Sequence, residues 1–300
     1  MSTWRELREH AEHQLGLAGL DTAANEARWI VEQASGLRGG ELVADERAVA
    51  PTMAETQVET MIRRRTAGEP LQYVLGEWSF RGIDLYVDPR VLIPRPETEV
   101  TAQVAIDEAV AAGARRGRHD AWSGAREEFI VVDLGTGSGA LAIALAAELP
   151  DAEVWATDSD ADALAVARAN AAGHAGAATR IRLSEGDWFE ALPEQLRGHV
   201  RVVVSNPPYV ALHEVDGLPT EVVAFEPHTA LVSGPTGMEA IERIITDALG
   251  WLSPTGSLVV EIAPHQADAA AKLARSGGFR SASVQHDLAG RERVLVARVQ

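Results

Sequence analysis

The sequence predicts an α/β protein in which a parallel sheet lies between helices, preceded by a small helical bundle. From residue 129 onward, apolar strand-like runs alternate with segments of helical period, which is the pattern of a parallel sheet covered on both faces. The first 68 residues show helical periodicity instead. A chain of 300 residues is long enough for two domains. We expect a helical domain over 1–68, a β-hairpin linker over 69–96 and an α/β domain over 97–300.

Three helices are expected in the amino-terminal domain. Apolar residues recur at helical spacing from Trp4 to Leu15 and again from Ala27 to Ala34. Pro51 favours the start of a third helix, which runs to about Arg65 before "AGEP" ends it. The three amphipathic segments together predict a bundle.

The linker is expected to contain a β-hairpin. The stretch "YVLGEWSFRGIDLYV", residues 73–87, is rich in aromatic and β-branched residues and predicts two strands. In "LIPRPETEV" two prolines then remove backbone donors, and we expect a helix to start at Thr98 or Glu99. The polar residues 112–128, rich in glycine and arginine, are typical of an exposed loop.

The α/β domain shows its alternation in order along the chain. The expected strands are 129–135, 153–158, 180–187, 200–208, 257–263, 282–288 and 293–299, and the expected helices are 140–149, 161–173, 238–249 and 266–277. The last two strands follow each other without a helix. We therefore expect an antiparallel pair at the edge of the sheet.

Composition limits the classes of function. The absence of cysteine excludes disulfides and thiolate metal sites, and no apolar stretch is long enough for a membrane helix. The charged start "MSTWRELREHAEHQL" is unlike a secretion signal, so we expect a cytoplasmic protein. A formal charge of −17 disfavours a nucleic-acid substrate, because the phosphate backbone is repelled at long range.

A glycine-rich loop follows the first strand of this domain, in "VVDLGTGSGALAIAL". Glycines there let the backbone turn tightly and approach a ligand, and the helix start offers free N–H donors. The loop consists of Gly135, Thr136, Gly137, Ser138 and Gly139. Three interpretations remain open: a nucleoside-type methyl donor, a dinucleotide, whose G-x-G-x-x-A fingerprint also fits, or a tight turn without a ligand.

The next two strands end in residues that suit a nucleoside. Asp158 closes "EVWATD", where a carboxylate can accept both ribose hydroxyls. Asp187 can accept a hydrogen bond from an exocyclic amine, and Trp188 can stack on a purine. The alternatives are that Asp158 only caps the following helix and that Trp188 is a buried core residue.

The fourth strand runs into "SNPPYV", whose tetrad Asn206, Pro207, Pro208 and Tyr209 is the candidate catalytic site. Ligands of open α/β sheets lie outside the carboxyl ends of the strands, so the tetrad faces the glycine loop. The Asn206 oxygen and a backbone carbonyl beside Pro207 can accept both hydrogens of a substrate –NH₂ group. Prolines keep these acceptors rigid, and Tyr209 can lie against a planar amide.

An amide nitrogen held in this way needs an electrophile that is already activated. The methyl sulfonium of S-adenosylmethionine fits this need, because in-line positioning then matters more than acid–base catalysis. The sequence shows no histidine or carboxylate pair at a convincing metal-ligand spacing. We therefore expect S-adenosylmethionine as the cofactor and no metal.

Seven segments, in this order, resemble the glutamine methyltransferases that modify peptide chain release factors. They are "GEPLQYVLGEWSF", "LIPRPETE", "DLGTGSGALAIAL", "GDWF", "SNPPY", "FEPHTAL" and "DLAGRERVLVAR". The "NPPY" motif also occurs in adenine-N6 methyltransferases of DNA and RNA, but "LIPRPETE" and "FEPHTAL" are not typical of those. The chain departs from the family at Ala263 and Pro264, where glycine is usual.

The resemblance implies a Rossmann-like class I methyltransferase domain joined through a β-hairpin to a helical domain that docks the substrate. It implies methyl transfer to the glutamine of the Gly-Gly-Gln tripeptide of bacterial class I release factors. The loop 135–139, Asp158, Trp188 and Asn206 would contact the cofactor, and 206–209 the glutamine. Residues 95–99 would either lie close to the cofactor or hold the helix start. The alternative activities are glutamine methylation of a ribosomal protein and adenine-N6 methylation of nucleic acid. We expect the protein to be a monomer.

Overall fold

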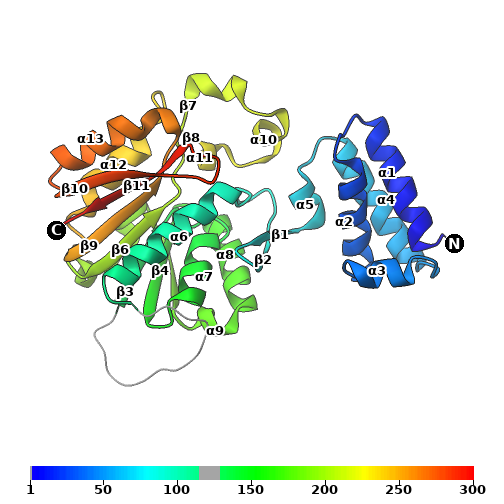
Figure 1. Cartoon of the computed structure of the whole chain (residues 1–300), viewed down its shortest axis with the longest axis horizontal. Coiled ribbons are helices and arrows are strands. Elements are labelled where there is room, and N and C mark those ends of the chain that lie inside the picture. The colour runs from blue at the N-terminus through cyan, green and yellow to red at the C-terminus, as the bar shows by residue number, and fades with distance from the viewer. Residues whose placement is uncertain (1, 115–128) are drawn as a thin grey trace. The chain divides into compact units, whose positions relative to one another are not determined.

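The computed structural model describes residues 2–114 and 129–300, so the expected loop over 112–128 lies almost entirely outside the described residues. The chain divides into two compact units. One unit contains the residues up to Glu77 together with Pro219–Phe225, and the other contains Trp78–Leu218 and Glu226–Gln300. The first unit is helical, and the second contains a large sheet with helices on its faces (Figure 1).

The helical unit is built on the three expected helices, α1 (Trp4–Leu17), α2 (Ala23–Ser35) and α4 (Thr52–Thr66). Their apolar stripes meet in one core. A capping box starts α1, because the Glu6 N–H donates to Thr3 Oγ1 while the Glu6 carboxylate accepts from the Thr3 N–H at 2.8 Å. Three further short helices belong to the unit: α3 (Gly40–Asp45), α5 (Leu71–Leu75) and α10 (Thr220–Phe225).

The hairpin starts later than expected. Residues 73–75, which were expected in a strand, lie in α5, and that prediction is wrong. Pro70 precedes this helix and Gly76 ends it in the left-handed conformation, with φ of 74°, so both ends carry helix-terminal residues. The hairpin strands are β1 (Glu77–Phe80) and β2 (Ile83–Tyr86). The two residues between them have positive φ, as in a type I′ turn.

The second unit contains a seven-stranded sheet in the order β10-β11-β9-β6-β3-β4-β5. The strands are β3 (Phe129–Leu134), β4 (Ala152–Asp158), β5 (Ile181–Glu185), β6 (Val200–Ser205), β9 (Leu252–Glu261), β10 (Ser281–His286) and β11 (Glu292–Arg298). The five strands from β9 to β5 pair in parallel, whereas β11 and β10 are antiparallel. The predicted parallel sheet with an antiparallel edge is therefore confirmed.

Helices cover both faces of this sheet (Figure 1). One face carries α6 (Pro96–Ala111), α7 (Ala140–Glu148) and α8 (Ala161–Gly173), and the other carries α12 (Glu239–Ala248) and α13 (Ala267–Ser276). Alternate residues of β3 supply the two cores: Val131 packs with α6 and α7, whereas Val132 packs with α12 and α13. α6 begins two residues before Thr98, because Pro96 suits the first helical position.

Shorter elements complete the second unit. They are α9 (Ala175–Ala178), β7 (Val210–Ala211), α11 (His228–Leu231) and β8 (Val232–Gly234), with β7 and β8 paired in parallel. Sequence reasoning had assigned no structure between residues 210 and 237. Within the described ranges, no helix combines the length and the apolar character that crossing a bilayer requires.

Candidate active site

The central strands bring three of the predicted residues to one edge of the sheet. Leu134, the last residue of β3, pairs with Thr157 of β4 and with Ser205 of β6. The next residue along each strand is a predicted site residue: Gly135, Asp158 and Asn206. Parallel register therefore places the glycine loop, the carboxylate and the carboxamide side by side at the carboxyl edge.

A cavity with about 170 Å³ of accessible space opens at this edge. Its lining includes the predicted residues Gly135, Thr136, Gly137, Ser138, Asp158, Asp187, Trp188, Asn206 and Pro208. Gly139, Pro207 and Tyr209 were predicted as site residues but do not line it. The mixed lining of glycines, carboxylates and an indole suits the polar and flat parts of a nucleoside.

The glycine loop needs glycine for two different reasons. Gly139 caps α7 with φ of 84°, and a Cβ there would lie 3.3 Å from the Ala167 Cβ, so α7 and α8 approach too closely for a side chain to fit without a shift. Gly135 has φ of 71°, and a Cβ there would lie 3.5 Å from the Trp188 ring. Both positions favour glycine because of their positive φ, and at Gly139 the tight contact with α8 adds a steric reason.

Asp158 is held by backbone donors of the loops beside it. Its Oδ2 accepts from the Gly137 N–H at 2.8 Å and its Oδ1 from the Asp160 N–H at 3.0 Å. Burial raises the pKa of this carboxyl. The cap of α8 is Asp160, whose side chain accepts from the Asp162 N–H, so the interpretation of Asp158 as that cap is wrong. The Asp158 carboxylate faces the cavity instead.

Trp188 lies in a strained backbone conformation at the wall of the cavity. Its φ of 48° is in the left-handed region, which a bulky side chain rarely adopts. The indole is partly buried against the core and lies beside Gly135, while Asp187 next to it is exposed. Strain of this kind is characteristic of ligand sites, and here it places a flat apolar face in the cavity.

The tetrad leaves the sheet with its four side chains in different environments. The Asn206 Nδ2 donates to Thr98 Oγ1 at 3.1 Å, and Asn206 and Pro208 line the cavity. Pro207 is buried. Tyr209 packs partly against the core outside the cavity lining, and burial raises the pKa of its phenol to about 12. In this structure only the first and third residues of the tetrad reach the cavity.

The backbone of the tetrad is held from behind by Gln266, which sequence reasoning did not identify. Gln266 is buried, and its Nε2 donates to the Tyr209 carbonyl at 2.9 Å and to the Gly237 carbonyl at 3.0 Å. Its Oε1 accepts from the Ala263 N–H, which closes a 3₁₀ turn over Pro264–Gln266. The turn at the position where this chain departs from the family pattern thus fixes one end of the tetrad.

Replacing Gly237 by alanine is expected to destabilise this support. Gly237 has φ of 80°, and a Cβ there would lie 2.6 Å from the Tyr209 carbonyl oxygen. We expect the free energy of unfolding to fall by about 1–3 kcal/mol, as measured by urea denaturation. Gly217→Ala is the control, since no atom lies within 4 Å of a Cβ there; equal stability of the two variants would contradict the prediction.

The segment "LIPRPETE" is a set of structural contacts around the cavity. Arg95 pairs with the buried Glu226 of "FEPHTAL", which also accepts from the Ile93 N–H. Glu97 accepts from Arg291 at 2.7 Å, and Glu99 accepts from the Arg81 N–H at 2.9 Å. Within 95–99 only Thr98 lines the cavity. Sequence reasoning had assigned no individual roles here, because the partners lie far away in the sequence.

Asp133, the acidic residue before the glycine loop, was also not predicted as a site residue. Its Oδ2 accepts from Thr136 Oγ1 at 2.6 Å and from the Ala142 N–H at 3.1 Å, which ties the loop to the start of α7. Its Oδ1 is buried without a hydrogen-bond partner among the described residues. Burial raises the pKa of this carboxyl to about 7. The position of an acidic residue at the end of a fully buried strand was the available sequence clue.

Asp133 predicts a pH dependence of stability. Because its pKa rises from 3.8 to about 7 on folding, its contribution is fully present below about pH 4 and is lost as the pH rises to about 7. We expect the free energy of unfolding of the native chain to fall relative to that of Asp133→Asn across this range. Urea denaturation at a series of pH values measures the difference, and parallel curves for the two proteins would argue against a raised pKa.

In the part of the chain that the structure describes, no cluster of His, Cys, Asp and Glu side chains has the arrangement of a metal site.

Two family models match the chain: the PrmC N-terminal domain over residues 6–76 and the methyltransferase small domain over residues 124–234. Among solved structures, the catalytic domain of hMettl16 in complex with the MAT2A 3'UTR hairpin 6 aligns with a TM-score of 0.54 at 15% identity, covering 82% of both chains. A methyltransferase from Pyrococcus furiosus aligns with a TM-score of 0.50 at 15% identity, covering 80% of this chain and 97% of that one. Fold and site thus define a Rossmann-like class I methyltransferase.

Curated relatives narrow this class to one family. A release factor glutamine methyltransferase from Cereibacter sphaeroides is 37% identical over 95% of both chains. One from Bordetella pertussis is 40% identical over 90% of this chain and 92% of the relative, and one from Nitratidesulfovibrio vulgaris is 36% identical over 99% and 95%. The chain belongs to the release factor glutamine methyltransferase family, and the resemblance seen in the sequence is confirmed.

Proposed function

We propose that this enzyme transfers a methyl group from S-adenosylmethionine to the side-chain amide nitrogen of the glutamine in the Gly-Gly-Gln motif of bacterial class I release factors. One observation carries the proposal: the Asn206 carboxamide lines the cavity beside the glycine loop while its Nδ2 is engaged with Thr98. Its Oδ1 is thus available to accept a hydrogen bond from a substrate –NH₂ group.

The cavity fits the proposed cofactor. Beside the glycine loop, the indole of Trp188 offers a stacking face and the Asp158 carboxylate an acceptor for ribose hydroxyls. S-adenosylmethionine supplies an activated methyl sulfonium when bound. Asp158 and Trp188 would hold the nucleoside, and Asp187 would accept from the adenine amine.

The residues of the tetrad would make different contacts with the substrate amide. Asn206 Oδ1 and the backbone carbonyl at Pro207 would accept the two amide hydrogens and keep the nitrogen lone pair directed at the methyl group. Pro207 is buried and has no N–H, so its backbone geometry is stiff. We propose that the Tyr209 ring borders the glutamine amide once a substrate is present. No side-chain base is required before methyl transfer.

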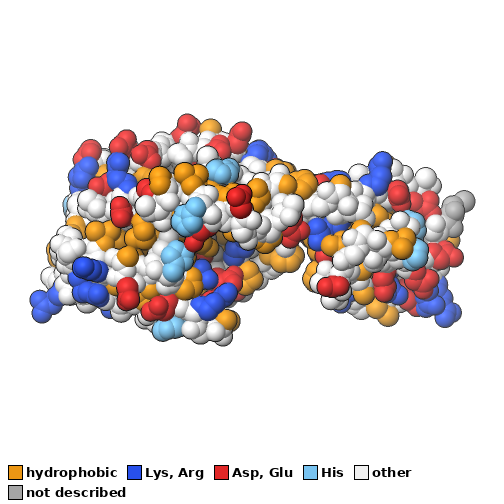
Figure 2. Space-filling model, turned by 90° about the horizontal axis from the view of Figure 1, so that it is seen from above, with side chains coloured by type: hydrophobic (Ala, Val, Ile, Leu, Met, Phe, Trp, Pro, Cys, Tyr) orange, Lys and Arg blue, Asp and Glu red, His pale blue; other side chains and the backbone are white. Residues whose placement is uncertain are grey.

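Charge supports a protein substrate over a nucleic acid. The chain has a formal charge of −17. Among the described residues on the face shown in Figure 2, Lys and Arg side chains are interspersed with Asp and Glu side chains and form no continuous basic surface. The similarity to an RNA-bound methyltransferase, at 15% identity, concerns the fold alone. We further propose that the enzyme acts in the cytoplasm and as a monomer.

Mass spectrometry tests this proposal directly. Release factors and ribosomal proteins are incubated with the enzyme and methyl-labelled S-adenosylmethionine, digested and analysed. We expect a gain of one methyl group on the glutamine of the Gly-Gly-Gln peptide of a release factor. Labelling of a ribosomal-protein glutamine alone, or of adenine in an added RNA, would overturn the proposal in favour of another substrate.

We propose that the helical unit docks the body of the release factor. If so, KM for an intact release factor should lie well below KM for a short Gly-Gly-Gln peptide, while kcat stays similar, because remote contacts contribute binding energy. Steady-state kinetics with both substrates measures this difference. Equal KM values would exclude a docking contribution.

A further inference from the structure

The Asn206 carboxamide can serve the reaction in only one of its two orientations. A carboxamide has an acceptor end, Oδ1, and a donor end, Nδ2, of almost the same shape. A substrate –NH₂ group needs the acceptor end. The residues that contact Asn206 on the side away from the cavity must therefore distinguish Oδ1 from Nδ2. If the carboxamide rotated by half a turn, its Nδ2 hydrogens would face the hydrogens of the substrate –NH₂ group.

The fold places a threonine and a buried carboxylate behind Asn206. Ser205 of β6 pairs with Val260 of β9, so the following residues, Asn206 and Glu261, lie next to each other at the carboxyl edge of the sheet. α6 packs across these strands and presents Thr98 and Thr101, which are one helical turn apart and both buried. Thr98 Oγ1 lies 3.1 Å from Asn206 Nδ2.

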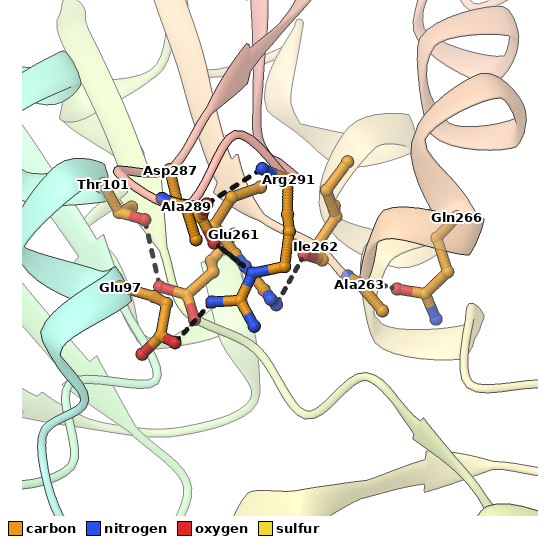
Figure 3. A network of polar contacts seen from close by, with 10 residues as sticks. Glu97, Thr101, Glu261, Ile262, Ala263, Gln266, Asp287, Ala289 and Arg291 are labelled. Atoms are coloured by element: carbon orange, nitrogen blue, oxygen red, sulfur yellow. Dashed lines mark hydrogen bonds and ion pairs between the residues drawn. The ribbon is translucent and has the colours of Figure 1, made fainter.

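Glu261 is the buried hydrogen-bond acceptor behind Asn206 and the two threonines. Its side chain is 1% exposed, and its Oε2 accepts from Thr101 Oγ1 at 3.0 Å (Figure 3). Hydrogen bonding by the side chains of Thr98 and Thr101 lowers the pKa of this carboxylate against the effect of burial, with Thr98 the larger of the two contributions. Thr98 thus lies between the carboxylate of Glu261 and the carboxamide of Asn206.

The number of hydrogens decides the direction of these bonds. An ionised carboxylate accepts only, and a threonine hydroxyl has one hydrogen to donate. When Thr98 donates that hydrogen to Glu261, only its lone pairs remain for Asn206. Asn206 must then present its Nδ2 to Thr98 and its Oδ1 to the cavity.

We propose that Thr98, held by Glu261, is a positioning residue that fixes the orientation of the Asn206 carboxamide toward the substrate amide. The inference rests on the proposed function, because the acceptor end matters only if the substrate offers an –NH₂ group. It assigns a role to one residue of "LIPRPETE" and to the last residue of β9. It also explains why a carboxylate is buried behind a site that uses no acid–base step.

The arrangement implies a dependence on pH. Burial raises the pKa of Glu261 to about 7. Two other ionisable groups influence the pKa of Glu261: Glu97 raises it and Arg293 lowers it. The charge of Glu261 in turn raises the pKa of the Tyr209 phenol. Protonated Glu261 can itself donate to Thr98, which frees the threonine hydrogen and removes the distinction between the two ends of Asn206.

Three variants of α6 test the proposal in single-turnover methyl transfer to a Gly-Gly-Gln peptide at about pH 8.5, where a group with a pKa of about 7 is ionised. Thr98→Val removes the hydroxyl but keeps the shape, and we expect the rate to fall about 10- to 100-fold, as for other small misplacements of reacting groups. Thr98→Ser keeps the hydroxyl and should restore most of the rate. Thr101→Val, the matched control, removes the other hydroxyl bond to Glu261 without touching Asn206 and should leave the rate nearly unchanged.

Measurements of stability in urea and of the rate as a function of pH distinguish a positioning role of Thr98 from a role in packing alone. Thr98→Val and Thr101→Val should lose similar amounts of stability in urea, so a rate loss confined to Thr98→Val cannot come from unfolding. The native rate should rise with pH through about 7, and this rise should be absent in Glu261→Gln. Equal rates of Thr98→Val and Thr101→Val, or the same rise in Glu261→Gln, would overturn the inference. Absence of glutamine methylation by the native enzyme would instead overturn the proposed function.

Discussion

Asn206→Ala is expected to lower the rate of methyl transfer about 10²- to 10³-fold, the usual loss when one preorganised hydrogen-bonding group of an active site is removed. The substitution removes the only side-chain acceptor of the tetrad that lines the cavity. Without it, the backbone carbonyl at Pro207 would be the one remaining acceptor proposed for the substrate amide, which is too little to keep the nitrogen in line with the methyl donor. Affinity for the cofactor should fall only modestly, because the glycine loop, Asp158 and Trp188 remain in place.

Single-turnover methylation of a Gly-Gly-Gln peptide measures the rate, and calorimetric titration with S-adenosylhomocysteine measures the affinity. The matched control is Asn25→Ala, the same chemical change at an exposed position of the helical unit. Unchanged turnover of Asn206→Ala would exclude the proposed role of the carboxamide. Loss of cofactor binding as large as the loss of rate would assign Asn206 to the cofactor alone.

The parts of the fold that sequence predicts are those fixed by local period and strand order. The seven strands of the sheet, its antiparallel edge and the positions of Gly135, Asp158 and Asn206 follow from apolar runs and from the rule that parallel strands end at one edge. α5 was missed because its five residues are too short for a helical period to emerge among aromatic and β-branched neighbours.

The parts of the site that sequence does not predict are held by contacts between distant residues. Gln266 reaches the Tyr209 carbonyl from 57 residues away, and Thr98 reaches Asn206 from 108. Gln266 carries no local pattern that indicates a role in the site, and Thr98 was predicted only as one of residues 95–99, without a role of its own. The motif also did not predict that the Tyr209 side chain lies outside the cavity lining. The direction of that side chain depends on how β7 and the turn at 264–266 hold the backbone.

Asp158→Ala is expected to raise the dissociation constant for S-adenosylhomocysteine at least about 10²-fold. The carboxylate would accept two ribose hydroxyls, and each charge-assisted bond contributes about 1.5–3 kcal/mol. The same change releases the Gly137 N–H, which Asp158 Oδ2 binds at 2.8 Å, so part of the loss could arise from the loop. Asp158→Asn separates the two effects, because it keeps a carbonyl oxygen for Gly137 but removes the charge.

Titration calorimetry of these variants therefore distinguishes recognition of the ribose by Asp158 from support of the glycine loop by Asp158. We expect Asp158→Asn to lose most of the affinity that Asp158→Ala loses, and the exposed control Asp162→Ala to lose none. Because burial raises the pKa of Asp158, affinity of the native enzyme should also decline as the pH falls through that raised pKa, and this decline should disappear in Asp158→Asn. Full affinity in Asp158→Asn would show that the carboxylate only holds the glycine loop and that the ribose is recognised by other groups of the cavity.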